Sequence, residues 1–140
     1  ALTGIRGLIT QHQVTINTNI PPNTWVVGIL PYLDSIFLNL ITNAIKYRSP
    51  KRKATIDVLV TLLEQEYQIR VTDNGLGIDL AKHEKRIFGL HETFHGNTDA
   101  KGIGLFITKH QIESMGGRIE VESTVDVGST FTFYLKKAAT

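Results

Sequence analysis

Three polar side chains recur at helical spacing within residues 32–47. Asn39 and Asn43 are four residues apart, and Lys46 follows three residues later, so a helix would point all three side chains the same way. Carboxamide oxygens suit a hard cation such as Mg²⁺, and an ammonium group suits phosphate. The row could therefore bind a metal–phosphate group, although an amphipathic helix with a solvated polar face would show the same spacing.

Two glycine-containing segments could complete such a site. Asp73 ends an alternating strand pattern and is followed by Gly75 and Gly77. Glycines let the backbone approach a ligand closely, and a carboxylate can accept a hydrogen bond from an exocyclic amine. Gly102 and Gly104 open a second helical pattern, where backbone N–H groups and the helix dipole favour anions. Taken singly, Asp-Asn-Gly is also a common turn, and a lone Gly-x-Gly is weak evidence.

The composition limits the class of protein. The chain has 140 residues, of which 41% are hydrophobic and 20% charged, and this favours one soluble globular domain with a real core. It has no cysteine, which excludes a disulfide framework and a thiolate zinc site. The net charge of +2 is too small to indicate nucleic-acid binding. No apolar run approaches the roughly 20 residues of a membrane span, and a chain that begins ALTG is expected to be cut from something longer.

The remaining patterns predict the elements that would position these residues. Residues 32–47 form one helix with Pro31 in its first turn, because seven apolar residues follow one stripe: Leu33, Ile36, Phe37, Leu40, Ile41, Ala44 and Ile45. A short charged helix is expected at residues 80–88, a mobile aperiodic loop at 89–101, and an amphipathic helix from Gly102 to the Gly116-Gly117 pair. Strands are expected at residues 12–20, 25–30, 54–63, 67–72, 118–123 and 129–136, the third and fourth forming an antiparallel hairpin.

Four motifs occur in a fixed order along this pattern: NLITNAIKY at residues 39–47, DNGLG at 73–77, GIGL at 102–105 and GSTF at 128–131. In this order the chain resembles the ATP-binding catalytic domain of sensor histidine kinases. These belong to the superfamily of gyrase, heat-shock chaperone, histidine kinase and mismatch-repair ATPases. The resemblance extends over residues 12–136, nearly the whole chain, and four ordered motifs make it specific.

The resemblance implies a fold and a setting. The fold would be an α/β (α+β) two-layer sandwich, with about three helices on a mixed, mostly antiparallel sheet of about five strands, the Bergerat-type ATP-binding fold. Residues 1–140 would be a single domain, with 1–11 as a linker remnant from an upstream dimerisation and phosphoacceptor domain. That domain would make the homodimer and would pass phosphate to a response regulator receiver domain. The setting would be a bacterial two-component system in the cytoplasm, either free or as the cytoplasmic portion of a membrane-anchored sensor, with no nucleic-acid or membrane contact by this segment.

The resemblance also implies roles for individual residues. Asn43 would ligate Mg²⁺, Asn39 would face the same metal–phosphate region, Lys46 would contact phosphate and Tyr47 would border the nucleotide. Asp73 would accept the adenine amino group. The other positions expected around ATP are Gly75, Gly77, Ile78, Gly102, Ile103, Gly104, Leu105 and, from the last motif, Thr130. The residues expected to act in the transfer itself are Asn39, Lys46 and Lys101.

The chain departs from the family pattern around the second glycine motif. A further glycine usually stands two residues before Gly102, where this sequence has Ala100. The loop before it is short, and Lys101 is our candidate for the contact with the γ-phosphate. His91 and His95 are interpreted as part of the surface of the loop at residues 89–101 rather than as ligands.

The identity of residue 39 bears on the reaction. Hydrolytic members of the superfamily carry Glu where this chain has Asn39, and a carboxamide cannot serve as a general base. This favours transfer to an imidazole outside the chain, because none of its own histidines has the helical His-Glu/Asp context of an acceptor: His12, His83, His91, His95 and His110. The chain alone is thus expected to bind Mg·ATP with little turnover. A water-activating ATPase module and a nucleotide-binding pseudokinase module stay open as alternatives.

Overall fold

The computed structural model describes residues 14–19, 30–78 and 104–136. Within these ranges one sheet of five strands, in the order β1-β2-β3-β5-β4, carries two helices. This confirms the expected α+β architecture, and the third helix expected at residues 80–88 lies outside the described residues. The elements are β1 (Thr15–Asn19), α2 (Leu30–Lys46), β2 (Thr55–Leu62), β3 (Glu66–Asp73), α4 (Gly104–Ser114), β4 (Arg118–Thr124) and β5 (Gly128–Lys136).

The sheet is mixed and mostly antiparallel, as predicted. β1 pairs with β2 in parallel, while β2–β3, β3–β5 and β4–β5 are antiparallel. Parallel neighbours need a long crossover, and α2 lies within it. The predicted strand at residues 25–30 is outside the described residues except for Leu30, which is the first residue of α2 and not the end of a strand. Pro31 is therefore the second residue of this helix, still in the first turn, where its missing N–H costs nothing.

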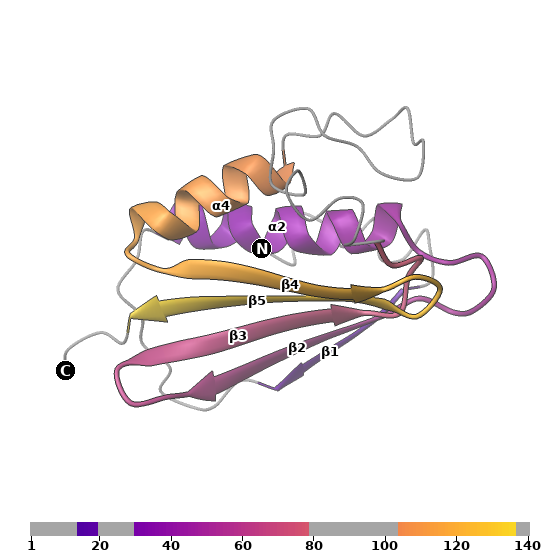
Figure 1. Cartoon of the computed structure of the whole chain (residues 1–140), viewed down its shortest axis with the longest axis horizontal. Coiled ribbons are helices and arrows are strands. Elements are labelled where there is room, and N and C mark those ends of the chain that lie inside the picture. Colours follow the sequence, from indigo (N-terminus) through magenta and orange to yellow (C-terminus); the bar gives the residue numbers. More distant parts are fainter. Residues whose placement is uncertain (1–13, 20–29, 79–103, 137–140) are drawn as a thin grey trace.

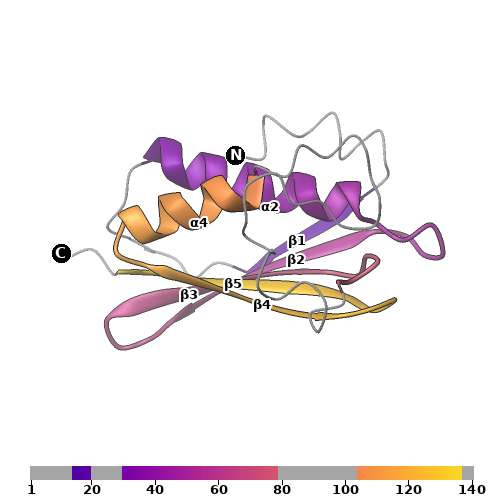
Figure 2. The same ribbon diagram turned by 45° about the horizontal axis from the view of Figure 1, so that its top comes forward.

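The two helices lie side by side on the same face of the sheet, and the described elements leave its other face uncovered (Figures 1 and 2). The strands show the alternation that this arrangement requires. In β2, Ile56, Val58 and Val60 are buried, whereas the residues between them are exposed. One layer of apolar side chains between helices and sheet is thus the core of the domain.

The stripe predicted on α2 fills the centre of that core. Ile36, Leu40 and Ile41 are at most 2% exposed, and Phe133 from β5 is fully buried beneath the helix. The ring of Phe37 meets that of Phe133 edge-on, with 5.7 Å between centroids. Full burial of one such side chain stabilises a fold by about 1.5–3 kcal/mol, so this stripe fixes where α2 sits on the sheet.

The second helix, α4, packs less completely. Ile112 and Met115 are buried, but Ile107, which we expected on the same apolar face, is 37% exposed. The helix ends at a glycine: the Gly117 N–H donates to the Ile112 carbonyl at 3.0 Å, and Gly116 has a φ of 79°, as in helix ends that need a left-handed residue. No helix among the described residues is long and apolar enough to cross a membrane.

We predict that the stability of the domain depends on the covered face of the sheet. Phe133→Ala should lower the free energy of unfolding by about 3–5 kcal/mol, because it leaves a cavity under α2. Leu59→Ala is the matched control, since Leu59 lies on the uncovered face and is 39% exposed. It should cost under about 1 kcal/mol. Urea denaturation measures both, and equal losses would contradict a core confined to one face.

Candidate functional site

The predicted motifs converge at one end of the two layers. The last turns of α2, the end of β3 and the beginning of α4 point toward this end (Figure 1). The segment that follows β3, residues 74–78, is called the exit loop here. Its Leu76 N–H donates to the carbonyl of Tyr47, the first residue after α2, at 2.9 Å. The C-terminal end of α2 is thereby tied to the strand that carries Asp73.

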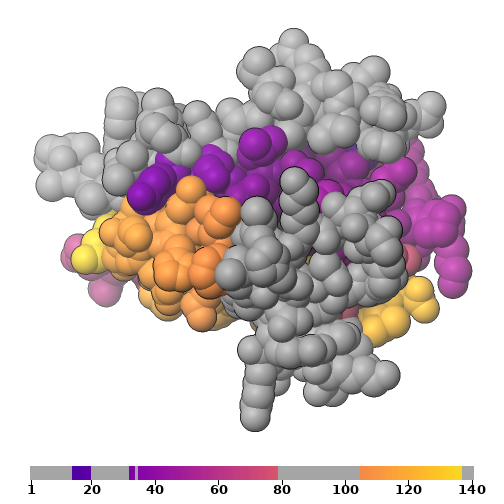
Figure 3. Space-filling model, turned by 90° about the horizontal axis from the view of Figure 1, so that it is seen from above, coloured from indigo at the N-terminus to yellow at the C-terminus, as the bar shows by residue number. Residues whose placement is uncertain are grey.

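The polar row of α2 lies where the spacing predicted. Asn39 and Asn43 are half-buried and Lys46, the last residue of the helix, is exposed. The Asn39 amide Nδ2 donates to the hydroxyl of Thr108, a fully buried residue of α4, at 3.3 Å. Seen from above, α2 and α4 lie against each other (Figure 3), and this hydrogen bond links the row to the helix opened by the second glycine motif.

The donor set near this row limits how a metal could be held. The described residues contain no cluster of three or more His, Asp or Glu side chains that could form a cage for a cation. A carboxamide oxygen such as that of Asn43 fits Mg²⁺ instead, because Mg²⁺ keeps several waters and takes its other ligands from substrate phosphates. The residues present therefore suit a metal that arrives with a nucleotide.

The Asp73 carboxyl, at this end of the sheet, has a perturbed pKa. Asp73 is the last residue of β3 and follows Ile69 and Val71 on the covered face of the sheet. Its Oδ1 accepts a hydrogen bond from the Gly75 N–H at 2.9 Å. Burial raises the pKa of the Asp73 carboxyl above its ordinary value, and backbone hydrogen bonds from Gly75 and Ser129 lower it by less. A carboxylate held in this way can accept a hydrogen bond from a ligand.

The glycines of the exit loop are needed for close packing. A Cβ on Gly75 would lie 2.6 Å from the Tyr47 carbonyl oxygen, so a side chain there would push α2 away from the loop. Gly77 has a φ of +73°, and a Cβ on it would lie 2.1 Å from the carbonyl oxygen of Thr124. Next to it, Ile78 is buried and its N–H donates to the Ser123 hydroxyl at 2.7 Å. The exit loop thus packs closely against the end of α2 and against β4, with no room for a side chain at Gly75 or Gly77.

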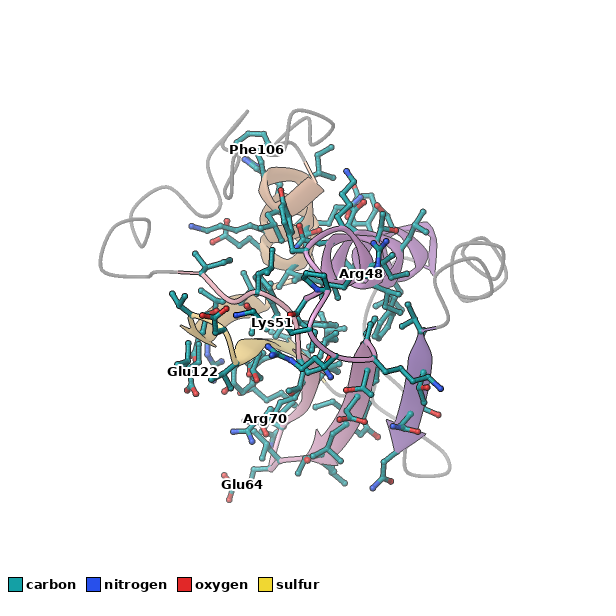
Figure 4. The ribbon with its side chains drawn as sticks, turned by 90° about the vertical axis from the view of Figure 1, so that its right-hand side faces the viewer. Arg48, Lys51, Glu64, Arg70, Phe106 and Glu122 are labelled. Atoms are coloured by element: carbon teal, nitrogen blue, oxygen red, sulfur yellow. The ribbon has the colours of Figure 1, made fainter. Side chains whose placement is uncertain are left out.

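The structure does not bring Thr130 to Asp73. Asp73 is paired in register with Ser129, whereas Thr130 is paired with Thr72, and successive residues of a strand point to opposite faces. The hydroxyls of Thr130 and Thr72 are 3.2 Å apart on the uncovered face. On that same side Arg70 and Glu122 point away from the helices (Figure 4). The residue of the last motif that lies beside Asp73 is Ser129, which is 7% exposed.

The pattern of β5 contained a signal for this difference. Phe131 and Phe133 are buried and alternate with the half-buried Thr130 and Thr132, so the same parity places Ser129 on the covered face. The position around ATP was assigned to Thr130 from its place in the last motif, without considering which face of the strand each residue occupies. Thr108, the partner of Asn39, had no comparable signal, because it lies inside an ordinary helical pattern.

Some predicted site residues lie outside the described part of the chain: Lys101, Gly102, Ile103 and the loop expected at residues 89–101. Gly104 is the first residue of α4, which agrees with a glycine motif at a helix N-terminus. Leu105 is half-buried and packs against the core.

A helix face with two half-buried carboxamides, a half-buried carboxylate at the end of β3 and the glycines of the exit loop thus lie at one end of this α+β domain. Residues 28–139 match the family described as histidine kinase-, DNA gyrase B- and HSP90-like ATPase. This match covers more than half of the sequence, and the chain belongs to that family.

The curated relatives are sensor proteins and histidine kinases of greater length. Cyanobacterial phytochrome A of Nostoc sp. is 38% identical over 135 residues, which is 95% of this chain and 17% of the relative. The phosphate regulon sensor protein PhoR of Haemophilus influenzae is 32% identical over 133 residues, 93% of this chain and 31% of the relative. The chain therefore spans less than a third of either protein.

Solved structures show the same fold. The mycobacterial sensor histidine kinase MprB superposes with a TM-score of 0.83 at 19% identity, over 99% of this chain and 93% of that one. Full-length ShkA, solved in complex with AMPPNP, gives a TM-score of 0.78 at 22% identity, over 99% of this chain and 30% of that one. Histidine kinase catalytic domains are thus the structural neighbours of this chain.

The raised pKa of Asp73 predicts a pH dependence of stability. The folded state holds the proton of the Asp73 carboxyl more tightly than the unfolded chain does, and this stabilises the fold. The stabilisation is fully present below the pKa that Asp73 has in the unfolded chain. It is lost as the pH rises through the folded pKa. Asp73→Asn removes the titration and should flatten this part of the profile. Urea denaturation of both proteins from about pH 3 to pH 7 tests it, and identical profiles would show that Asp73 titrates alike in both states.

Proposed function

We propose that this chain binds Mg·ATP and holds the γ-phosphoryl group for transfer to a histidine on a separate, upstream domain of a sensor kinase. The observation that carries the proposal is the placement of Asp73. It combines a half-buried carboxylate, fixed by a backbone N–H, with an exit loop hydrogen-bonded to the end of the helix that bears Asn43 and Lys46. Membership of an ATPase family supports nucleotide binding by this chain.

The two ends of the nucleotide would meet different chemistry. At the end of the site that holds the base, the Asp73 carboxylate accepts a hydrogen bond from the exocyclic amine of adenine. The Ser129 side chain lies on the same face and in register with Asp73, so we assign to it the place that the motif had given to Thr130. Gly75, Gly77 and Ile78 line the pocket floor. A base recognised by a buried acceptor is discriminated strongly, because an analogue without the donor leaves that acceptor unpaired.

At the phosphate end, α2 and the beginning of α4 would act together. Lys46 supplies a positive charge at the open end of α2, Asn43 supplies the oxygen for Mg²⁺, and Gly104 begins a helix whose first N–H groups face anions. When bound, Mg²⁺ would neutralise phosphate charge. Phosphoryl transfer depends mostly on such positioning and charge neutralisation, so this set needs only a nucleophile delivered from outside. Lys101, Gly102 and Ile103 keep their expected places at the γ-phosphate side as part of the proposal.

The carboxamide of Asn39 favours phosphoryl transfer over the hydrolysis of ATP. Its carboxamide cannot remove a proton from water, and its Nδ2 is hydrogen-bonded to Thr108. The one histidine within the described ranges, His110, lies exposed on α4 with its ring 4.6 Å from that of Phe106. An acceptor histidine on a further domain agrees with the greater length of the relatives. That domain would also form the homodimer and serve a response regulator.

The assignment of Asp73 predicts a loss of affinity without a loss of fold. Asp73→Asn should weaken ATP and ADP binding roughly ten- to a hundred-fold, because a charge-assisted hydrogen bond contributes about 1.5–3 kcal/mol. Asp57→Asn is the control, because it removes an exposed carboxylate from the neighbouring strand and should leave affinity unchanged. Calorimetric titration with ADP measures both. Unchanged affinity in Asp73→Asn would remove the basis of the proposal.

The hydrolytic alternative has its own test. Steady release of phosphate from ATP by the unmodified chain would favour hydrolysis over transfer.

The assignment of Asn43 predicts a loss that appears only with metal. Asn43→Ala should weaken Mg·ATP binding about tenfold or more while changing metal-free binding of adenosine little, because the carboxamide oxygen acts through Mg²⁺. Calorimetry of wild type and variant, with ATP in the presence and absence of Mg²⁺, is the measurement. If the two proteins depend on Mg²⁺ to the same extent, Asn43 is a polar residue on a solvated face.

A further inference from the structure

Arg52 is hydrogen-bonded to two segments that are distant from it in sequence. It lies between α2 and β2, in the positively charged run that the sequence presents as a solvated loop. Its Nε donates to the Asn74 carbonyl at 2.6 Å, and its Nη2 donates to the carbonyls of Gly75 at 2.8 Å and Asp126 at 2.6 Å. A longer contact of 3.4 Å reaches the Val127 carbonyl. One guanidinium thus joins the exit loop to the turn between β4 and β5.

These contacts reach the carboxylate of Asp73 through one peptide group. The Asn74 carbonyl and the Gly75 N–H belong to the same rigid, planar unit. Arg52 binds the carbonyl oxygen of this peptide group. The N–H of the same group, which belongs to Gly75, donates to Asp73 Oδ1 at 2.9 Å. The orientation of the guanidinium therefore determines where this N–H points, and the N–H determines where the carboxylate oxygen lies.

The next peptide group is held in the same way. Arg52 binds the Gly75 carbonyl, and the Leu76 N–H at the other end of that plane donates to the Tyr47 carbonyl at 2.9 Å. The Leu76 carbonyl in turn accepts from the Asp126 N–H at 2.7 Å. Asp126 itself has a positive φ of 64°, which presents its carbonyl to the guanidinium. The first peptide plane is thus held between Arg52 and Asp73, and the second between Arg52 and the end of α2.

Only a guanidinium suits this arrangement. Arg carries five N–H donors in a planar fork, whereas Lys carries a compact ammonium that cannot span several carbonyls at fixed angles. The neighbouring Lys51 makes only a 3.9 Å ion pair with Asp126, and its side chain is 73% exposed. Lys53 is exposed as well. Arg52 therefore differs in role from Lys51 and Lys53, although the sequence presents the three alike.

We propose that Arg52 is a positioning residue for base recognition: it aims the Asp73 carboxylate at the exocyclic amine through the Asn74–Gly75 peptide. The inference rests on the proposed function, since it requires adenine to be the group that Asp73 meets. It adds that the preference for adenine over a purine without that amine depends on a residue that does not touch the base. A residue that only stabilised the fold would not affect this preference.

The test compares ATP with inosine triphosphate, whose base has a carbonyl oxygen in place of the amino group. Titration calorimetry with Mg²⁺ gives both dissociation constants for the 140-residue chain. Arg52→Ala should weaken ATP binding about tenfold and change inosine triphosphate binding little, so the preference falls by the same factor. Arg52→Lys should not restore it. Lys53→Ala, which removes a charge from the same loop, should keep the wild-type preference.

A second measurement needs no nucleotide. Hydrogen exchange of the Gly75 amide should be faster in Arg52→Ala by a larger factor than that of core amides such as Ile69, because its peptide plane is released. Equal weakening of both nucleotides, or unchanged exchange at Gly75, would overturn the role of Arg52. A wild-type chain that bound both nucleotides alike would instead refute the adenine assignment of Asp73. The exchange experiment would still decide whether Arg52 fixes the peptide.

Discussion

The burial of one stripe of α2 against one face of the sheet is the constraint on which the rest of the domain depends. Ile36, Leu40 and Ile41 are buried in the same core as Phe133, and the ring of Phe37 contacts that of Phe133. This packing sets both the position and the rotation of the helix. Since the rotation is fixed, the polar row at residues 39, 43 and 46 lies off the buried stripe, and Asn39 reaches Thr108 of α4. The same packing therefore supplies most of the stability and the geometry of the polar row, and neither can change alone.

The sequence predicted what depends on local pattern. The period of the α2 stripe, the alternation of β2 and β3, and the glycines that close α4 each specify one element, and all five described strands were expected within a few residues. The family followed from four motifs in order. Leu30, read as the end of a strand, belongs to the helix because its turn can begin as soon as Pro31 supplies a suitable φ.

What the sequence could not show depends on contacts between distant segments. Thr130 and Ser129 differ only in which face of β5 they occupy, and the face is decided by pairing with β3. Arg52 looked like one more solvated cation because its partners are backbone carbonyls, which carry no signature in the sequence. The bond from Asn39 to Thr108 joins residues 69 positions apart. Each of these contacts is specified only when the helices and strands have assembled.

The order of the strands leaves β4 at one edge of the sheet, with one side of its backbone not paired to another described strand. Such an edge can template pairing with a second chain, and proteins counter this with charged side chains along it. β4 carries Arg118, Glu120 and Glu122 at alternate positions, all exposed, and Arg118 also contacts Glu66 and the ring of Tyr134. A copy of β4 aligned in register beside it would bring like charges together. The edge thus opposes aggregation while its inward residues, Ile119 and Val121, still pack against the core.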